Sequence, residues 1–380
     1  DFSERSGRTG NIASSSAVSL PVSSSCDLDC KYCFYKDVAK NRKIANYHRM
    51  HKETLKNIVR EFIQKADKSV TFMFQGGEPT LIGSDFYAYY NQCVLEELKN
   101  KGKDFAVHSA LQTNGMHITE SLAKALSDGH FLVGVSLDGP EYIHNINRLN
   151  KKAESTFSGV MAGIEVLKKY NIDINILSVV TRNSLPFVKS IIDFYVSNNL
   201  FYMQFIAAID SFDKSLSFIN DKEFADFTLD MFDVWLDYYQ KGTFLSIRFI
   251  EDLFANLLTG KCYSCDLSGK CSNQNVIEAN GNLYPCDFYV LDEYLLGNTN
   301  RGIDNLNTEV LNKFTASEAL ANECSVCRLF KVCKGGCKRT RLASGHAFLC
   351  QSFKNLFAKR AAQIDFVLQN SFKNSLKNLL

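Results

Sequence analysis

The chain has 380 residues, of which 46% are hydrophobic and 22% are charged, and its formal net charge is +2. These values are typical of an ordinary globular protein with one large domain and a smaller one. The small net charge excludes a broad basic surface, and no apolar run approaches the roughly 20 residues that span a bilayer, so we expect neither nucleic acid nor a membrane as a partner.

Residues 1–16 are polar and rich in Ser and Gly, without the apolar core of a secretory signal. They predict a disordered leader or an artificial remnant. The chain contains 13 cysteines and no export signal, and in a reducing cytoplasm clustered thiols favour metal binding over disulfides. We therefore expect a cytoplasmic protein with metal centres.

Short runs of β-branched and aromatic residues alternate with amphipathic helical stretches through residues 17–218. The predicted strands are 17–22, 69–75, 105–112, 131–137, 174–180 and 201–207. The helices expected between them are 52–65, 85–100, 119–128, 154–170 and 185–198. Such repeated units imply a parallel sheet with right-handed crossovers. Because six units are fewer than the eight of a closed barrel, we predict an α/β fold with a partial (β/α)6 barrel.

Candidate functional loops directly follow the first four strands. A loop with three cysteines follows the first strand, and "GGEP" (76–79) follows the second. The third strand precedes "TNG" (113–115), and the fourth precedes "DGP" (138–140). Because ligands bind at the carboxyl ends of parallel strands, we expect these loops to surround one site.

The second half of the chain changes in composition. A linking segment, 219–261, contains two expected helices whose aromatic residues indicate core packing. Residues 262–350 hold nine of the 13 cysteines and predict a second domain built on metal. Residues 351–380 contain an amphipathic stretch and predict a C-terminal helix.

The cysteine spacing indicates more than one kind of centre. Cys26, Cys30 and Cys33 form a C-x3-C-x2-C run without a fourth thiol nearby. Three thiolates leave one iron of a four-iron cluster open, whereas a structural zinc site is normally closed by four ligands. Eight later cysteines suffice for two further four-thiolate sites, and their spacing alone fits zinc and iron–sulfur equally. Cys93, inside an expected helix, is predicted to be a buried apolar residue, and Cys262 has no assigned role.

These motifs are similar to those of a known family. The C-x3-C-x2-C run followed by an aromatic residue, with "GGEP" after the second strand, resembles the radical S-adenosylmethionine (SAM) superfamily. The later cysteine groups resemble its SPASM subgroup. From about residue 20 to 360, "CFY", "FQGGEPTL", "LQTNG", "DGPEYIHNINR" and "YPCDFYVLD" resemble the anaerobic sulfatase-maturating enzymes. The resemblance implies a radical SAM partial barrel at 17–218 and a SPASM auxiliary-cluster domain at 262–350.

The resemblance also implies SAM and three 4Fe–4S clusters as cofactors and assigns their residues. Cys26, Cys30 and Cys33 would hold the first cluster. A nearer auxiliary cluster would be held by Cys265, Cys271, Cys286 and Cys337, and a farther one by Cys324, Cys327, Cys333 and Cys350. The residues that would bind SAM are Tyr32, Gly76, Gly77, Glu78, Pro79, Ser136, Arg148 and Ile209. Asp287 would be the general base, and Tyr35 and Gln75 would bind the substrate peptide.

The implied reaction is oxidation of an active-site Cys or Ser of a sulfatase to Cα-formylglycine, started by a 5′-deoxyadenosyl radical. The implied partners are a sulfatase polypeptide and a small electron-donor protein, either flavodoxin or ferredoxin, and we expect a monomer. Two alternatives stay open at this point. One is a SPASM enzyme that crosslinks a ribosomally made peptide, and the other is a zinc-stabilised interaction module without catalysis.

Overall fold

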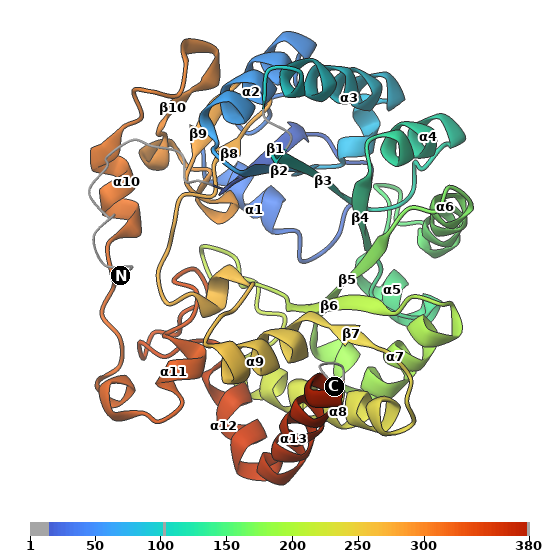
Figure 1. Cartoon of the computed structure of the whole chain (residues 1–380), viewed down its shortest axis with the longest axis vertical. Helices are drawn as coiled ribbons and strands as arrows, with labels where there is room; N and C mark the ends of the chain where they lie inside the picture. Colours follow the sequence, from blue (N-terminus) through green and yellow to red (C-terminus); the bar gives the residue numbers. More distant parts are fainter. Residues whose placement is uncertain (1–14, 102–103, 378–380) are drawn as a thin grey trace. The chain divides into compact units, whose positions relative to one another are not determined.

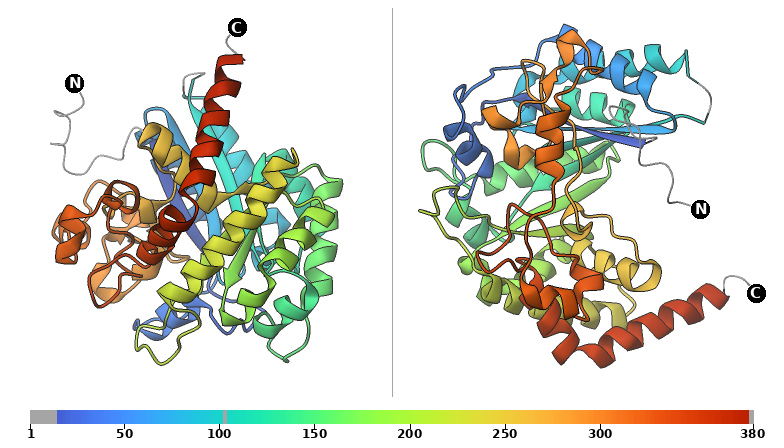
Figure 2. Two further views of the ribbon diagram at one scale, coloured as in Figure 1. Left: turned by 90° about the horizontal axis from the view of Figure 1, so that it is seen from below. Right: turned by 90° about the vertical axis from the view of Figure 1, so that its left-hand side faces the viewer.

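The computed structural model describes residues 15–101 and 104–377. These residues form two compact units (Figures 1 and 2). Unit 1 contains the described residues up to 137, together with 144–176 and 272–316. Unit 2 contains 138–143, 177–271 and the described residues from 317 onward. The thiol-rich segment 262–350 is therefore divided between the two units.

A parallel sheet forms the centre of unit 1. Its four long strands are β1 (Ser15–Ser23), β2 (Ser69–Gly76), β3 (Ala106–Thr113) and β4 (Phe131–Ser136). Each pairs in parallel with the next. The helices that follow or connect them are α1 (Phe34–Lys40), α2 (Lys52–Lys65), α3 (Ser84–Leu98), α4 (Glu120–Asp128) and α6 (Phe157–Lys169). Figure 1 shows α2, α3 and α4 side by side along this sheet, and the ring of Phe74 in β2 packs 4.8 Å from that of Tyr90 in α3.

Three short strands from the thiol-rich segment extend this sheet beyond β1. They are β8 (Val276–Ile277), β9 (Asn282–Tyr284) and β10 (Gly297–Asn298). β8 runs parallel to β1, while β9 and β10 continue the sheet in antiparallel pairs. Figure 1 shows these orange strands next to the blue β1. The helix α10 (Thr308–Thr315) completes unit 1.

Unit 2 contains parallel strands and a larger set of helices. β6 (Tyr202–Ala207) pairs in parallel with β7 (Ser246–Ile247), and β5 (Ile174–Val180) crosses the boundary between the units. Its helices are α7 (Val188–Ser197), α8 (Asp221–Gln240), α9 (Arg248–Thr259), α11 (Phe330–Cys333), α12 (Cys350–Lys359) and α13 (Ala361–Lys377). The helix α5 (Glu141–Asn147) also spans the boundary. α8 begins with a capping box, in which Asn220 and Glu223 each accept a hydrogen bond from the other's backbone N–H.

The observed elements confirm the predicted mixed α/β fold with a parallel sheet, and they correct several details. Residues 15 and 16, assigned to the leader, belong to β1, while 1–14 lie outside the described residues. The single predicted C-terminal helix is two helices, α12 and α13, because the chain leaves helical geometry at Arg360 (Figure 2, red). The guanidinium of Arg360 pairs with Asp233 at 2.6 Å.

The predicted boundaries at 218, 261 and 350 do not coincide with the two units, and those domain boundaries stay a prediction. Among the described residues, no helix combines the length and apolar character needed to cross a membrane.

Candidate active site

The loop between β1 and α1 carries three thiols, those of Cys26, Cys30 and Cys33. All three side chains are partly buried, and none of the three forms a disulfide. Two of the sulfur atoms face N–H groups: Leu28 N lies 3.4 Å from Cys26 Sγ, and Arg148 Nη1 lies 3.8 Å from Cys30 Sγ. N–H groups directed at sulfur stabilise thiolate ligands and tune iron–sulfur centres. The donor set therefore fits a cluster bound at this loop.

The environment of Cys26 couples any metal binding to proton release. Burial raises the pKa of the Cys26 thiol to about 12, although the Leu28 backbone N–H lowers it. A thiol with such a pKa is protonated at neutral pH unless a cation takes the place of its proton. Iron binding at this loop would therefore release a proton from Cys26.

The second loop lies against the first through glycine backbone. Gly77 N donates to Ser23 O, and Glu78 N donates to Ser25 O, each at 2.8 Å. A Cβ atom on Gly77 would come within 2.4 Å of Ser25 O, and Gly76 has a φ of +120° that favours glycine. The "GG" of the predicted cofactor loop is thus needed for the close approach of two backbone segments.

We expect Gly77→Ala to destabilise the protein by about 1–3 kcal/mol, because the new methyl group meets the rigid backbone of Ser25. Gly297→Ala is the matched control, since its Cβ would meet only the flexible end of Leu306 at 3.3 Å. The measurements are denaturant unfolding and iron content after anaerobic reconstitution. Equal losses in both variants would contradict the tight contact between the loops.

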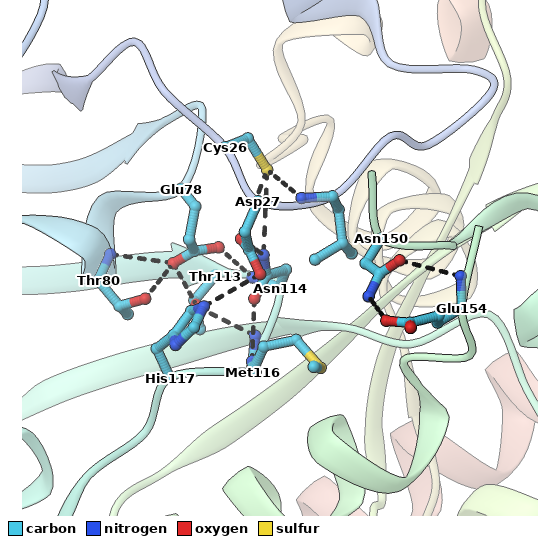
Figure 3. A network of polar contacts seen from close by, with 12 residues as sticks. Cys26, Asp27, Glu78, Thr80, Thr113, Asn114, Met116, His117, Asn150 and Glu154 are labelled. Carbon is cyan, nitrogen blue, oxygen red and sulfur yellow. Dashed lines mark hydrogen bonds and ion pairs between the residues drawn. The ribbon is translucent and has the colours of Figure 1, made fainter. Parts of the chain in front are cut away.

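The Glu78 carboxylate holds the second and third loops together. Oε1 accepts hydrogen bonds from Thr80 N at 3.0 Å, Thr80 Oγ1 at 2.6 Å and Thr113 Oγ1 at 2.7 Å, and Oε2 accepts one from Asn114 N at 2.6 Å. Figure 3 shows these donors around the carboxylate, and Glu78 is 1% exposed. Burial raises the pKa of Glu78, and the four donors lower it. The side chain predicted to meet the cofactor is thus occupied by protein donors, so a cofactor would meet the backbone of this loop.

Three polar residues beside Cys26 were not predicted as site residues. Asn114 Nδ2 donates to Asp27 Oδ1 at 2.8 Å, and His117 Nε2 lies 3.0 Å from Asp27 Oδ2 (Figure 3). Asn114 Nδ2 also lies 4.0 Å from Cys26 Sγ. The motif "TNG" after the third strand was the one signal that could have indicated Asn114.

The structure brings two of the other predicted cofactor residues to the three-thiol loop. The Arg148 guanidinium lies over the Tyr32 ring, 5.5 Å from its centroid, and both residues are nearly buried. Ser136 at the end of β4 accepts a hydrogen bond from Gln112 Nε2 at 3.0 Å, and Pro79 O accepts one from Tyr87 at 3.0 Å. Ile209 belongs to unit 2, where it lines a cavity of about 240 Å³ formed by residues near 207–221 and 339–343.

The predicted base, Asp287, and the predicted substrate residue Gln75 meet in unit 1. Asp287 begins a 3-10 turn after β9. Its side chain is partly buried, and this burial raises its pKa. Hydrogen bonds lower the same pKa, including those from Phe288 N at 2.9 Å and from the Gln75 side chain. A buried carboxylate with a raised pKa suits proton transfer.

Tyr35, predicted to bind the substrate peptide, has a largely buried side chain with a partner distant in sequence. Its side chain is 7% exposed, and its hydroxyl donates to both carboxylate oxygens of Glu278 at 3.1 Å. Burial, followed by the charge of Glu278, raises the pKa of Tyr35 far above its usual value. Short sequence motifs could not reveal that Glu278 is the partner of Tyr35, because the two residues are 243 positions apart in the chain.

The later cysteines lie in groups. Burial raises the pKa of Cys333, and the nearby thiols of Cys350, Cys324 and Cys327 raise it further, so the four members of the predicted farther set lie together in unit 2. Burial also raises the pKa of Cys337, with a smaller contribution from Cys271.

The predicted nearer set is divided, because Cys286 belongs to unit 1 and Cys265, Cys271 and Cys337 belong to unit 2. Within the described parts of the chain, no group of three or more His, Cys, Asp or Glu converges on a single metal ion. A four-iron cluster takes one thiolate on each iron, so its ligands need not converge in that way.

The two cysteines outside these sets have local roles. Cys93 is 3% exposed in α3, which confirms the prediction of a buried apolar residue. The thiol of Cys262 donates to Leu267 O at 2.9 Å.

Comparisons with known proteins agree with this arrangement. Residues 20–184 match the family model of the radical SAM superfamily, and 265–328 match SPASM, an iron–sulfur cluster-binding domain. A cysteine-type anaerobic sulfatase-maturating enzyme of Clostridium perfringens is 38% identical over 89% of this chain and 94% of its own. A serine-type enzyme of Bacteroides thetaiotaomicron is 27% identical over 91% of this chain and 89% of its own.

Solved structures give the same result for the fold. Native anSMEcpe with bound AdoMet has a TM-score of 0.85 and 36% sequence identity, covering 94% of this chain and 100% of that chain. Native anSMEcpe with bound AdoMet and Cp18Cys peptide has a TM-score of 0.83 and 35% identity, covering 94% of this chain and 99% of that chain.

Proposed function

Because this chain belongs to the anaerobic sulfatase-maturating enzymes of the radical SAM superfamily, we propose that it oxidises an active-site Cys or Ser of a sulfatase to Cα-formylglycine. It is a radical SAM oxidoreductase that uses SAM and a 4Fe–4S cluster, with additional iron–sulfur clusters in its SPASM domain. The iron–sulfur description of that domain argues against the zinc module. The main structural support for the proposal is the hydrogen bond between the side chains of Asp287 and Gln75, which lie in the same unit as the three-thiol loop.

The residues at the three-thiol loop fit the cofactor pair. When bound, SAM and the reduced cluster supply a 5′-deoxyadenosyl radical that removes a β-hydrogen from the substrate residue. Cys26, Cys30 and Cys33 would hold the cluster. Arg148, whose Nη1 lies 3.8 Å from Cys30 Sγ, would pair with a carboxylate such as that of SAM. The close packing of Gly76 and Gly77 against the first loop would fix the backbone that the cofactor meets.

Asp287 would take the proton from the substrate thiol or hydroxyl, and Gln75 would hold the Asp287 carboxyl in position through its side-chain hydrogen bond. A Ser alcohol yields the aldehyde directly, whereas a Cys thiol yields a thioaldehyde that water converts to the aldehyde with release of hydrogen sulfide. Either oxidation removes two electrons. One leaves with the β-hydrogen, and the other needs an acceptor. Two auxiliary 4Fe–4S clusters would accept it, giving three clusters in the enzyme. The ligands we assign are Cys265, Cys271, Cys286 and Cys337 for one cluster and Cys324, Cys327, Cys333 and Cys350 for the other.

We also propose that the substrate residue is Cys rather than Ser. The cysteine-type relative is 38% identical to this chain, whereas the serine-type relative is 27% identical over a similar length.

A small electron-donor protein, flavodoxin or ferredoxin, would reduce the first cluster in the cytoplasm, and the enzyme would act as a monomer. Support for the electron donor comes from the chemistry of the cluster, which needs an electron for each cleavage of SAM.

The test uses the anaerobically reconstituted protein with SAM, a reductant and two sulfatase peptides that differ only in Cys or Ser at the target position. We expect the Cys peptide to show the mass change from thiol to aldehyde, with one 5′-deoxyadenosine formed for each product. Mass spectrometry follows both species. Formation of 5′-deoxyadenosine without change in either peptide would overturn the substrate assignment, and preferential conversion of the Ser peptide would reverse the Cys assignment.

A further inference from the structure

A buried charged cluster in unit 1 joins the segment after the three-thiol loop to the strands that precede Asp287. We call it the Arg42 cluster, and its members are Tyr35, Arg42, Tyr47, Glu278 and Tyr284. At its centre, Arg42 Nη1 pairs with Glu278 Oε1 at 2.8 Å, and the two side chains are 1% and 0% exposed. The guanidinium lies 4.5 Å from the Tyr47 ring centroid and 5.6 Å from that of Tyr35.

Stability alone does not account for this pair. Removing two charges from water costs free energy, and well-packed apolar residues in place of a buried ion pair are often as stable or more stable. Burial raises the pKa of Glu278, and the charge of Arg42 and the hydrogen bonds from Arg42 and Tyr35 offset this effect only in part. What the ion pair does provide is a fixed geometry, because charged and hydroxyl groups in a dry site hold their partners in one arrangement.

The contacts of the cluster link two functional segments. Tyr35 lies two residues after Cys33, and its hydroxyl donates to Glu278, which follows β8. Tyr284 ends β9 three residues before Asp287, and its hydroxyl lies 3.1 Å from that of Tyr47.

Next to these contacts, the rings of Phe34 and Phe288 meet edge to face with centroids 4.9 Å apart. Phe34 directly follows Cys33, and Phe288 directly follows Asp287. Three contacts therefore join the segment 34–47, which follows the three-thiol loop, to the segment 278–288, which contains the base.

We propose that the Arg42 cluster is a positioning device that fixes Asp287 relative to the three-thiol loop, so that proton removal and hydrogen abstraction occur on the same bound residue. This inference rests on the proposed function of Asp287 as the base. Arg42, Glu278 and Tyr35 are positioning residues here, since they act through the β8–β9 segment.

The first test is the double variant Arg42→Met with Glu278→Leu, which replaces the ion pair by apolar side chains. We expect it to fold, to keep its iron and to form 5′-deoxyadenosine. Formylglycine formed per 5′-deoxyadenosine should fall about tenfold or more, because small misplacements of catalytic groups cost large factors in rate. Asp304→Asn is the control, since it removes a carboxylate of the same unit that pairs with Lys65 at 2.6 Å on the surface. The control should keep the wild-type product ratio.

Tyr35→Phe keeps the ion pair and removes one hydroxyl, so it tests the link if the double variant fails to fold. We expect a product ratio several-fold below that of the wild type at an unchanged melting temperature. Hydrogen exchange of residues 280–292, measured without SAM or peptide, should be faster in both variants and unchanged in Asp304→Asn. Unchanged exchange together with an unchanged product ratio would overturn the proposal. If no protein, including the wild type, converts peptide, the proposed function fails, and the exchange data alone decide whether the cluster fixes the segment.

Discussion

Asp287→Asn is expected to leave 5′-deoxyadenosine formation near the wild-type level while reducing formylglycine formation at least 100-fold, as is typical when a general base is lost. The amide keeps the shape of the side chain and its contact with Phe288 N but cannot accept the substrate proton. Cleavage of SAM would therefore be uncoupled from oxidation of the peptide, which would stay largely unchanged. Mass spectrometry of 5′-deoxyadenosine and peptide from the same reaction measures this uncoupling directly.

The pH dependence of the wild-type enzyme follows from the same carboxyl group. Burial raises the pKa of Asp287 above its usual 3.8, so the carboxylate accepts its proton at a higher pH than an exposed Asp does. Since the base acts in its ionised form, peptide oxidation should fall as the pH is lowered through this raised value, while formation of 5′-deoxyadenosine falls less. The same shift means that ionisation of Asp287 costs stability as the pH rises through the folded pKa. The neutral Asn variant should therefore be at least as stable as the wild type at neutral pH.

Asp304→Asn provides the matched control, because Asp304 also lies in unit 1 and pairs with Lys65 at 2.6 Å at the exposed surface. It should convert peptide at the wild-type rate. An Asp287→Asn enzyme that retains a tenth or more of the wild-type conversion would remove Asp287 from the role of base. In that case the hydrogen bond to Gln75 would be a structural contact only.

The long elements of the fold could be predicted because their signals are local. The strand predicted at 174–180 has those bounds in the structure, and the predicted helix at 52–65 does as well. β8 and β10 are two residues each, too short for an alternating pattern, and their positions depend on pairing with strands distant in sequence. The division of 262–350 between two units depends on the same long-range pairing, and no composition change marks it.

The candidate site shows the same distinction between local and distant information. The motif "GGEP" predicted a functional loop, but the partners of the Glu78 carboxylate include Thr113 and Asn114, about 35 residues later in the chain. Motif comparison likewise selected Tyr35, whereas its buried partner Glu278 lies outside every recognised motif. Motifs selected Gln75 and Asp287 separately, and the structure shows that their side chains form a hydrogen bond. The other neighbours of these residues could be identified only from the fold.

Cys30→Ala should abolish both 5′-deoxyadenosine and formylglycine, because a cluster held by three thiolates has no spare ligand on this loop. The loss of iron should be about four atoms per chain, with the iron of the SPASM domain retained. Iron analysis and the absorption of the reconstituted protein measure the first effect, and mass spectrometry measures the second. Arg148 Nη1, 3.8 Å from Cys30 Sγ, would lose its sulfur partner in this variant, so SAM binding should weaken as well.

Cys93→Ala distinguishes the loss of a ligand from the loss of a buried thiol. Cys93 is buried in α3 away from the predicted ligand sets, so its removal should cost about 1 kcal/mol of stability through lost apolar contact and leave iron and both products unchanged. If Cys30→Ala kept its full iron content, the three-thiol loop would not be a cluster site, and the assignment of Arg148 to the SAM carboxylate would fall with it. If instead it lost iron throughout the chain, folding beyond unit 1 would depend on this cluster, because seven of the eight predicted auxiliary ligands lie in unit 2.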